Sequence, residues 1–516
     1  MQALVDYSFR LIYNRSIDEQ NTSIKPVKSR KISLPAVWVV STFIFCLIFA
    51  CTLAPRALAQ SRIQDSPSQY SSIFRNVFEF IQRHYVEEVE SKVLFEGAMT
   101  GMFNALGDPY SAFLPESEMK DLNDTTQGSF GGVGLYVSKP GPRPDGRPSF
   151  LEVAAPIEDT PGWRSGINPG DLIISINGES TDILSSDESV ARLRGQPGTD
   201  VRLIIRRGEL VEFPVTITRA VIEVPTVKHD MIGNIGYLKL LTFTPMTVDR
   251  SRDAINDFQS KDYRAIILDL RNNYGGLLNS AVGVSSLFLE GGVVVTTKSR
   301  IVTENQNFYA RGRAVVPAEI PVIVLINRGS ASASEIVAGA LKDRKRAFLV
   351  GEKTFGKGSV QQVYPLENAG FKITTARYFT PSDVNIDMVG IPPDREVLFP
   401  EFTESDAGEL NSLLNSNRIT EYFKNHPDPR NADIDGFARE LNRIYNLDIS
   451  LLRRLIRNEQ NRKTIAPVYD LEYDVQLYEA VKILREENYR VLMQTTKTLK
   501  ALQEEALNSE NPAQAS

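Results

Sequence analysis

A serine at the junction between an apolar run and a helical pattern is the strongest candidate for chemistry in the sequence. Residues 327–335 read NRGSASASE and follow the apolar run 322–326. The change of pattern predicts that Ser332 lies at a helix N-terminus. The helix dipole there favours negative charge that develops around a nucleophilic hydroxyl. The residues from Ser332 to Glu335 also fit a capping box, which stabilises a helix and does no chemistry.

A lysine between two glycines is the candidate partner of this serine. Lys357 stands in the segment FGKGSVQ, residues 355–361, at the expected start of a strand. If it is buried beside Ser332, its pKa falls from about 10.4 towards the range of a competent base. A strand period of two predicts that Gln361 projects to the same side as Lys357. The alternative is an ordinary surface lysine, the commoner fate of this residue type.

The composition excludes several other functions. The chain has 516 residues, which predicts about two to four domains. Its three histidines, at positions 84, 229 and 426, are too far apart for a metal motif built from neighbours, and the candidate chemistry requires no metal or cofactor. With 58 Lys+Arg against 64 Asp+Glu and no basic block, nothing indicates a nucleic-acid partner.

Residues 1–59 are predicted to be a signal peptide or a membrane anchor. The apolar run 36–54 contains both cysteines, Cys46 and Cys51, and follows a basic stretch that would stay in the cytoplasm. Small residues at the −3 and −1 positions, Ala57 and Ala59, offer signal-peptidase cleavage before Gln60. This run of 19 residues, nearly all of them apolar, is also about long enough to span a bilayer, and Cys51 leaves a lipoprotein signal open. Each alternative places the rest of the chain outside the cytoplasm, in a periplasm-like compartment, either free or anchored in the inner membrane through 36–54.

An N-terminal helical segment is expected over residues 60–127. Apolar residues recur at helical spacing from Tyr70 to Leu106, and an interruption near 86–91 divides them into two helices. Residues 116–127 are predicted to be a polar connector that ends at a glycine.

Residues 128–218 have the pattern of a small, partly closed barrel. Short β-rich runs alternate with turn sequences, and one helix is expected at 186–193. The glycine-rich start, followed by GDLI and ING segments, resembles a PDZ domain in the circular arrangement of bacterial proteases. That resemblance implies that backbone N–H groups of this glycine-rich segment bind the terminal carboxylate of a peptide. The peptide then adds as a strand to the adjacent edge of the sheet. The start comprises Gly131, Gly132, Val133, Gly134 and Leu135; the expected strands are 133–137, 151–154, 172–176, 201–206 and 211–217.

Residues 219–400 alternate strands and helices, which predicts an α/β domain. The apolar runs at 265–270 and 322–326 are typical of buried strands. Residues 401–516 are predicted to form a C-terminal helical extension with a disordered end at 508–516. Other expected strands are 235–241, 347–351 and a β-rich 360–378; expected helices are 248–258, 278–288, 332–342, 473–484 and 489–507.

Three motifs together resemble the carboxyl-terminal processing peptidases, which are tail-specific serine proteases. The serine segment, FGKG around Lys357 and DLRNNYGG at 269–276 support the resemblance, which runs from about Phe74 to Asp394 and includes ALGDPYSAFL at 105–114. It implies a crotonase-like spiral core with an inserted PDZ domain. It also implies a Ser-Lys dyad, with Ser332 as nucleophile, Lys357 as general base and Gln361 orienting the lysine. The implied oxyanion hole consists of the backbone N–H groups of Gly276 and Ala333.

The resemblance implies an exported endopeptidase that recognises protein C-termini and cleaves near them through an acyl-enzyme, with the PDZ domain gating activity. Implied partners are proteins with free C-termini, an adaptor lipoprotein and further copies of the chain. Tyr274 stands where this family often has a small residue, and residues 401–465 match nothing in it. The alternatives are a non-catalytic binding scaffold on the same fold and a crotonase-type acyl-CoA enzyme, which would explain neither the PDZ-like region nor Lys357.

Overall fold

The computed structural model describes residues 66–141, 148–157, 159–208, 211–399, 403–427, 429–463 and 467–510. The expected signal or anchor at 1–59 lies outside the described residues. Within those ranges, no helix is both long enough and apolar enough to cross a membrane. The chain divides into two compact units, Met1–Leu94 and Phe95–Ser516, which are described separately.

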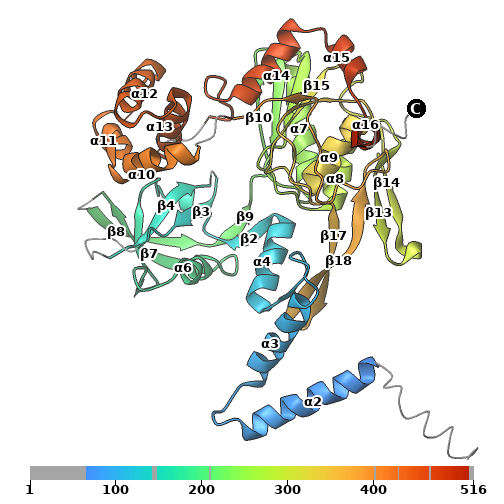
Figure 1. Ribbon diagram of the computed structural model, residues 1–516. Helices are drawn as coiled ribbons and strands as arrows, with labels where there is room; N and C mark the ends of the chain where they lie inside the picture. Colours follow the sequence, from blue (N-terminus) through green and yellow to red (C-terminus); the bar gives the residue numbers. More distant parts are fainter. Residues whose placement is uncertain are drawn as a thin grey trace, which may run out of the picture. The chain divides into compact units, whose positions relative to one another are not determined.

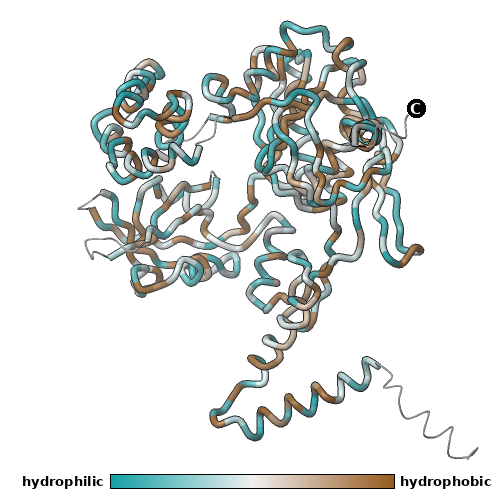
Figure 2. The backbone as a smooth tube through the Cα atoms, in the orientation of Figure 1, coloured by the Kyte–Doolittle hydropathy of each residue, from teal (hydrophilic) through white to brown (hydrophobic). Residues whose placement is uncertain are grey.

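The first unit contains the helix α2 (Pro67–His84). Its N-cap residue Ser66 accepts a hydrogen bond from the Gln69 N–H at 3.4 Å, and Pro67 occupies the first turn. Apolar and polar residues alternate along α2, yet none of its side chains is buried (Figure 2). The helix α3 (Ser91–Asn104) begins at the end of this unit, so the prediction of two helices with a break near 86–91 is confirmed.

The segment predicted as a polar connector is a helix, α4 (Glu116–Gln127), so that prediction was wrong. Glu116 and Glu118 stabilise its first turn through the helix dipole. The Met119 side chain packs closely over Gly370, where an added Cβ would lie 2.8 Å from the Met119 sulfur. Gly128, with φ of +69°, lies just past the helix end. Tertiary packing therefore outweighed the polar composition.

The small β domain expected from the sequence consists of a five-strand path, β3-β4-β5-β7-β8, with β6 paired to β5. The expected first strand, 133–137, starts later than predicted: β3 begins at Leu135, after Gly134 with φ of +78°. A separate strand before it, β2, pairs with β9. The helix α6 (Ser186–Leu193) is confirmed and carries a capping box from Ser185 to Glu188. The strands are β2 (Ser129–Gly132), β3 (Leu135–Ser138), β4 (Leu151–Pro156), β5 (Leu172–Ile176), β6 (Glu179–Ser180), β7 (Asp200–Arg207), β8 (Val211–Thr218) and β9 (Ala220–Glu223).

A six-stranded main sheet, β10-β11-β12-β15-β16-β19, forms the centre of the α/β region (Figure 1). Its strands are parallel from β11 to β19, and β10 pairs antiparallel at one edge. The helices α7 (Thr247–Ser260), α8 (Leu278–Ser286) and α9 (Ala333–Asp343) share one apolar core with alternate residues of these strands. The strands are β10 (Val227–Ile232), β11 (Ile235–Leu240), β12 (Ala265–Asp269), β15 (Val322–Ile326), β16 (Phe348–Gly351) and β19 (Arg395–Glu396).

The opposite face of the main sheet is covered by the C-terminal part of the chain. Leu477, Ala480 and Ile483 of α14 (Val475–Glu486) are buried against Ile267 and Ile323 of the sheet. The helix expected at 489–507 is broken into α15 (Tyr489–Thr495) and α16 (Leu499–Glu510). Residues 508–510 belong to α16, contrary to the expected disorder, and 511–516 lie outside the described residues. Residues 467–510 are therefore part of the core and not an appendage.

A second, antiparallel sheet carries the lysine candidate at one end. Its path is β1-β18-β13-β14, and β17 pairs with β18 in a hairpin. Lys357 lies just before the first strand of that hairpin. The strands are β1 (Ala112–Leu114), β13 (Val293–Ser299), β14 (Gln306–Tyr309), β17 (Ser359–Leu366) and β18 (Ala369–Phe379).

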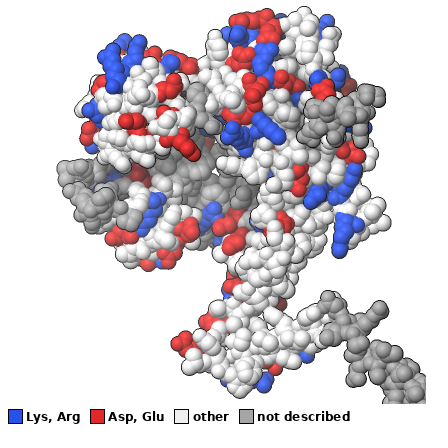
Figure 3. All heavy atoms as spheres, viewed as in Figure 1, with Lys and Arg blue, Asp and Glu red and all other residues white. Residues whose placement is uncertain are grey.

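Four helices between β19 and α14 have an apolar core of their own, which includes Leu413, Phe423, Phe437 and Ile456. They are α10 (Ala407–Asn415), α11 (Arg418–Asn425), α12 (Asn431–Tyr445) and α13 (Ile449–Lys463). On the face drawn in Figure 3, acidic and basic side chains are interspersed over the described surface.

The α/β class predicted from the alternation of strands and helices is confirmed.

Candidate active site

Ser332 lies at the turn that joins β15 to α9, and it is the N-cap residue of the helix, as the sequence predicts. Its backbone has φ of +55° and ψ of −113°, outside the regions that serine ordinarily adopts. Such a conformation costs on the order of 1–3 kcal/mol and persists only where the surroundings impose it. The serine is 8% exposed. The turn therefore presents a nearly buried serine in a strained conformation.

The carboxylate of Glu335 connects the serine turn to the lysine loop. It is fully buried and accepts hydrogen bonds from the N–H groups of Ser332 (2.9 Å), Gly356 (2.7 Å) and Lys357 (2.9 Å). The Thr354 hydroxyl donates a fourth at 2.6 Å. Burial raises the pKa of Glu335 above its ordinary value, although these four bonds oppose the shift. The capping interpretation of this residue is thus correct for one bond and misses the other three.

Glu335→Gln is expected to lower kcat/KM for the proteolysis that the resemblance implies about 100-fold, because the amide nitrogen would face backbone donors and displace the serine turn from the lysine loop. The melting temperature should fall as well, since buried N–H groups lose their acceptor. Steady-state proteolysis and thermal unfolding measure the two effects. Glu223→Gln, which alters an exposed ion pair with Arg250, is the matched control and should change neither. A fully active Glu335→Gln variant would contradict the role given to this carboxylate.

The side chain of Lys357 is half-buried and lies over an aromatic ring. Its Nζ is 4.6 Å from the ring centroid of Tyr110. Burial lowers the pKa of Lys357, and the charge of Lys372 acts in the same direction, against Asp108 and Glu335. The pKa of Lys357 is therefore lowered, as the sequence analysis expects for a lysine buried beside the serine.

The two candidate side chains are close in the fold but are not bonded to each other. Among the described residues, no hydrogen bond joins the Ser332 hydroxyl to the Lys357 ammonium. The Ser332 hydroxyl instead neighbours Tyr378: burial raises the pKa of Tyr378 to about 12, and the interaction with Ser332 opposes this rise. The structure shows Glu335 holding the two backbones together while each side chain has another partner.

Gln361 is placed differently from the expectation. Its amide nitrogen donates to the hydroxyls of Ser359 (3.0 Å) and Thr374 (3.2 Å), and it makes no hydrogen bond to Lys357 within the described ranges. The strand-period argument does not apply here, because β17 starts only at Ser359 and its pairing with β18 shifts register between Val360 and Gln361.

The glycines of the segment 269–276 bring a backbone loop against the serine. A Cβ added to Gly275 would lie 2.8 Å from the Ser332 Cβ, and one added to Gly276 would lie 2.2 Å from the Phe243 carbonyl oxygen. Both glycines have positive φ, +105° and +139°. The N–H groups of Gly276 and Ala333 donate to no acceptor among the residues that the structure describes. They are available to an oxyanion, as the resemblance implies. Tyr274 beside them is exposed.

Asn273 fixes this loop, a role that the sequence analysis missed. Its side-chain oxygen accepts from the Gly275 N–H (2.9 Å), and its side-chain nitrogen donates to the Leu240 carbonyl (2.9 Å). Its backbone carbonyl accepts from the Ala331 N–H at 3.1 Å and from the Ser334 hydroxyl at 2.8 Å. The signal available in the sequence was an asparagine in a glycine-rich segment.

Residues from the N-terminal part of the second unit also reach the lysine. Asp108 accepts from the Ser111 hydroxyl at 2.5 Å and from the Tyr110 N–H at 3.0 Å, which shapes the turn that carries the Tyr110 ring. Burial raises the pKa of Asp108, but bonds from Ser111 and Thr374 and the charge of Lys357 bring it below its ordinary value. Sequence spacing could not reveal this contact, because it depends on the pairing of β1 with β18.

The glycine-rich segment of the small β domain connects β2 to β3. The carbonyl groups of Val133 and Gly134 accept bonds from the N–H groups of Gly162 (2.7 Å) and Ile157 (2.9 Å), which fix the loop. Packing already requires two of the glycines: a Cβ on Gly131 would lie 2.1 Å from the Gly195 oxygen, and one on Gly134 would lie 2.3 Å from Thr160. Leu135 begins β3, which pairs only with β4 in the described sheet and leaves one edge open.

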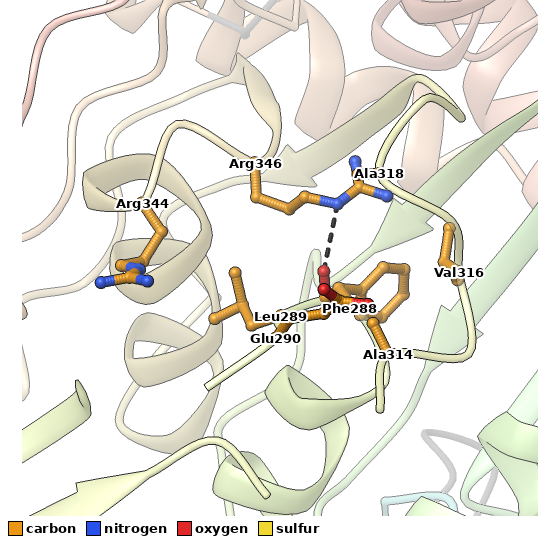
Figure 4. Close-up of a pocket in the computed structure, with 8 residues that line it drawn as sticks. All are labelled: Phe288, Leu289, Glu290, Ala314, Val316, Ala318, Arg344 and Arg346. Atoms are coloured by element: carbon orange, nitrogen blue, oxygen red, sulfur yellow. Dashed lines mark hydrogen bonds between the residues drawn. The ribbon is translucent and has the colours of Figure 1, made fainter. Parts of the chain in front are cut away.

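A cavity of about 150 Å³ lies among residues that belong to none of these groups. Figure 4 shows Arg346 pointing across it to the Phe288 carbonyl, to which its Nε donates at 3.1 Å. The other guanidinium nitrogens donate to the carbonyls of Ile320 and Pro317, each at 3.0 Å. Because its donors are satisfied by the backbone, Arg346 has a structural role, and this cavity is not the candidate active site.

Comparison with models of protein families identifies the class of protein to which this chain belongs. Residues 234–397 match the model described as peptidase family S41, residues 152–207 match a PDZ domain, and residues 54–117 match an activating protease CtpB N-terminal domain. The chain is therefore a serine-type peptidase with a PDZ domain. A carboxy-terminal-processing protease of Bartonella bacilliformis is 41% identical over 62% of this chain and 73% of that relative. The chain belongs to the family of carboxyl-terminal processing proteases.

Two further relatives in sequence agree with this assignment. A carboxyl-terminal-processing protease of Synechocystis is 37% identical over 59% of this chain and 71% of the relative. The carboxy-terminal processing protease CtpA of Bacillus subtilis is 32% identical over 67% of this chain and 73% of its own length. A solved structure of a photosystem II D1 C-terminal processing protease is 28% identical, with a TM-score of 0.38 over 63% of this chain and 92% of that chain.

Proposed function

We propose that this chain is an exported endopeptidase that hydrolyses peptide bonds near protein C-termini through a dyad of Ser332 and Lys357. The observation that carries this proposal is the buried Glu335 carboxylate, which bonds the backbone N–H groups of both residues. One acceptor thereby sets the distance between a strained serine and a lysine whose pKa burial lowers.

The first step requires a neutral Lys357 to leave the Tyr110 ring and accept the Ser332 proton. The alkoxide oxygen attacks the scissile carbonyl, and the negative charge on the carbonyl oxygen is stabilised by the N–H groups of Gly276 and Ala333. We assign to Gln361 the orientation of the lysine in this state, for which its side chain must exchange its bonds to Ser359 and Thr374 for one to Lys357. The lysine ammonium then donates its proton to the leaving amine, and an acyl-enzyme remains.

The second step regenerates the serine. Lys357, neutral again, takes a proton from water, which attacks the acyl carbon. The tetrahedral intermediate uses the same two N–H groups, and its collapse returns the proton to Ser332.

Substrate selection is assigned to the open edge of β3. A peptide adds there as an antiparallel strand, and its terminal carboxylate meets N–H groups of the segment from Gly131 to Leu135. Occupation of this edge favours the arrangement in which Lys357 reaches Ser332, so the PDZ domain gates cleavage. Such gating requires that the peptide bind the active arrangement more tightly than the resting one.

Cleavage of an unfolded protein such as casein by residues 61–516 is expected to rise when an apolar peptide with a free C-terminus is added. The same peptide with a C-terminal amide should stimulate at least about tenfold less, because the amide lacks the anionic oxygens that the loop would bind. The rate of substrate loss at several concentrations of each peptide measures the effect. Equal stimulation by both peptides would exclude carboxylate recognition. A pure binding scaffold would show no cleavage with either.

Export is proposed from residues 1–59, where basic residues precede the apolar run 36–54. N-terminal sequencing of the protein recovered from its native membrane and periplasmic fractions tests this. A mature chain beginning at Gln60 indicates a cleaved signal, and an intact chain in the membrane indicates an anchor. Recovery of the intact chain in the cytoplasm would contradict export.

A further inference from the structure

We propose that Asp474, in the C-terminal part of the chain, is a positioning residue of the active site. Through Arg271 it holds in place the oxyanion loop, residues 271–276. This inference rests on the proposed function, because it assumes that the N–H group of Gly276 serves the reaction. Asp474 lies well beyond residues 234–397, which match the peptidase family model.

The guanidinium of Arg271 lies between two carboxylates. Its Nη1 and Nη2 donate to the two oxygens of Asp474 at 2.7 and 2.6 Å, a bidentate pair. Its Nε and Nη2 donate to the two oxygens of Asp269 at 2.9 and 2.7 Å. The Tyr237 hydroxyl also donates to Asp269, at 2.6 Å. Arg271 thus has fixed partners on both sides and little freedom to rotate.

Burial makes this arrangement rigid. The Asp269 side chain is fully buried, that of Arg271 is 6% exposed and that of Asp474 is 20% exposed. Although burial alone would raise it, the pKa of Asp269 is held to about 2, chiefly by Arg271. The Asp269–Arg271 pair therefore stays ionised at any working pH and acts as a fixed support.

The oxyanion loop begins at Arg271. The Arg271 N–H donates to Asp269 at 2.9 Å, and the next N–H, that of Asn272, donates to the Asn327 side chain at 3.0 Å. Asn272 has φ of +57°, so the chain turns sharply at this point towards the glycines. Since only four residues separate Arg271 from Gly276, a displacement of the guanidinium would pass directly into the loop.

On the other side, Asp474 belongs to a segment that is itself anchored. It is the N-cap residue of α14 and accepts the Leu477 N–H at 3.0 Å. Its neighbour Gln476 accepts from Arg271 at 3.1 Å and donates to the Val397 carbonyl at 2.8 Å. The buried apolar side chains of α14 fix this end to the main sheet. The N-terminus of α14 thus supports the loop that would receive the oxyanion.

Asp474→Asn separates this role from helix capping, because asparagine caps a helix as well as aspartate does but cannot form the charged bidentate pair. Glu479→Gln is the matched control, since Glu479 lies on the same helix and pairs with Arg395 at 2.8 Å, away from the loop. Both variants, wild type and Ser332→Ala are compared as residues 61–516. The measurements are kcat and KM, the pH profile, the melting temperature and the Ki values of a peptide aldehyde and of the corresponding peptide alcohol. Active-site titration corrects each rate for the folded fraction.

For Asp474→Asn we expect kcat to fall about 10- to 100-fold with KM unchanged, as for a misplaced transition-state contact. The Ki of the aldehyde, whose adduct with Ser332 places an oxygen in the oxyanion hole, should rise by the same factor, and that of the alcohol should not change. The pH profile should keep its position. Glu479→Gln should behave as wild type.

Three results would overturn the inference: a kcat for Asp474→Asn within twofold of wild type, a rise in KM with kcat retained, or an equal loss in Glu479→Gln. Cleavage that persists in Ser332→Ala would instead refute the proposed nucleophile, so the two failures are distinguishable.

Discussion

Ser332→Ala is expected to reduce kcat for the cleavage of unfolded protein by at least about 10³-fold, because no other group can form the acyl-enzyme in its place. Any residual rate would come from substrate binding and the oxyanion donors alone. The bond from the residue 332 N–H to Glu335 involves only the backbone, so the turn that carries the residue should persist. Quantified proteolysis and thermal unfolding of the purified variant measure both effects.

Ser285→Ala provides the control for this substitution. The Ser285 hydroxyl is buried in α8 and has no hydrogen-bond partner in the described structure, so its removal should leave cleavage and stability nearly unchanged. Retention of full activity by Ser332→Ala, with loss in another serine variant, would mean that the nucleophile is misassigned.

Proteolysis by the wild-type protein is expected to increase with pH until Lys357 has lost its proton. Only the neutral amine accepts the serine proton, so well below the pKa of Lys357 the rate should rise about tenfold per pH unit. Burial lowers this pKa below its ordinary value, so the plateau should begin at a lower pH than a free lysine would allow. Values of kcat/KM between pH 5 and 10 test this dependence.

Lys357→Ala should remove this pH dependence and lower the rate by about 10²- to 10⁴-fold, the usual contribution of a general base. Lys357→Arg should be similarly inactive, because the guanidinium stays protonated. The neighbouring Lys353 is exposed, and Lys353→Ala is the matched control with an expected wild-type profile. An unchanged pH profile in Lys357→Ala would assign the base to another residue.

The sequence predicted those elements whose pattern is local. The buried strand β15, the helix α6 and the position of Ser332 at the start of α9 all follow from apolar runs and capping residues, and all are present. The pattern failed for α4, whose residues 116–127 are mostly polar, because the packing of Met119 over Gly370 is a tertiary contact. Periodicity also failed at Gln361, where a register shift interrupts the strand.

Within the candidate site, the sequence indicated the residue types but not how they are connected. Glu335 was interpreted from its spacing to Ser332 as a cap, whereas three of its four donors come from residues 354–357. The contact of Tyr110 with Lys357 likewise depends on strands far apart in the chain. Long-range pairing of this kind cannot be read from local periodicity.

The place of α14 on the main sheet also sets the point in synthesis at which the second face of this sheet can be covered. Ile267, Ile323 and Leu325 stay exposed on this face until residues 477–483 have been synthesised and can pack on them. A growing polypeptide therefore cannot bury both faces of this sheet, and Arg271 lacks its second carboxylate over the same interval. The loop of the candidate site therefore lacks one of its supports until residues 474–483 have been synthesised.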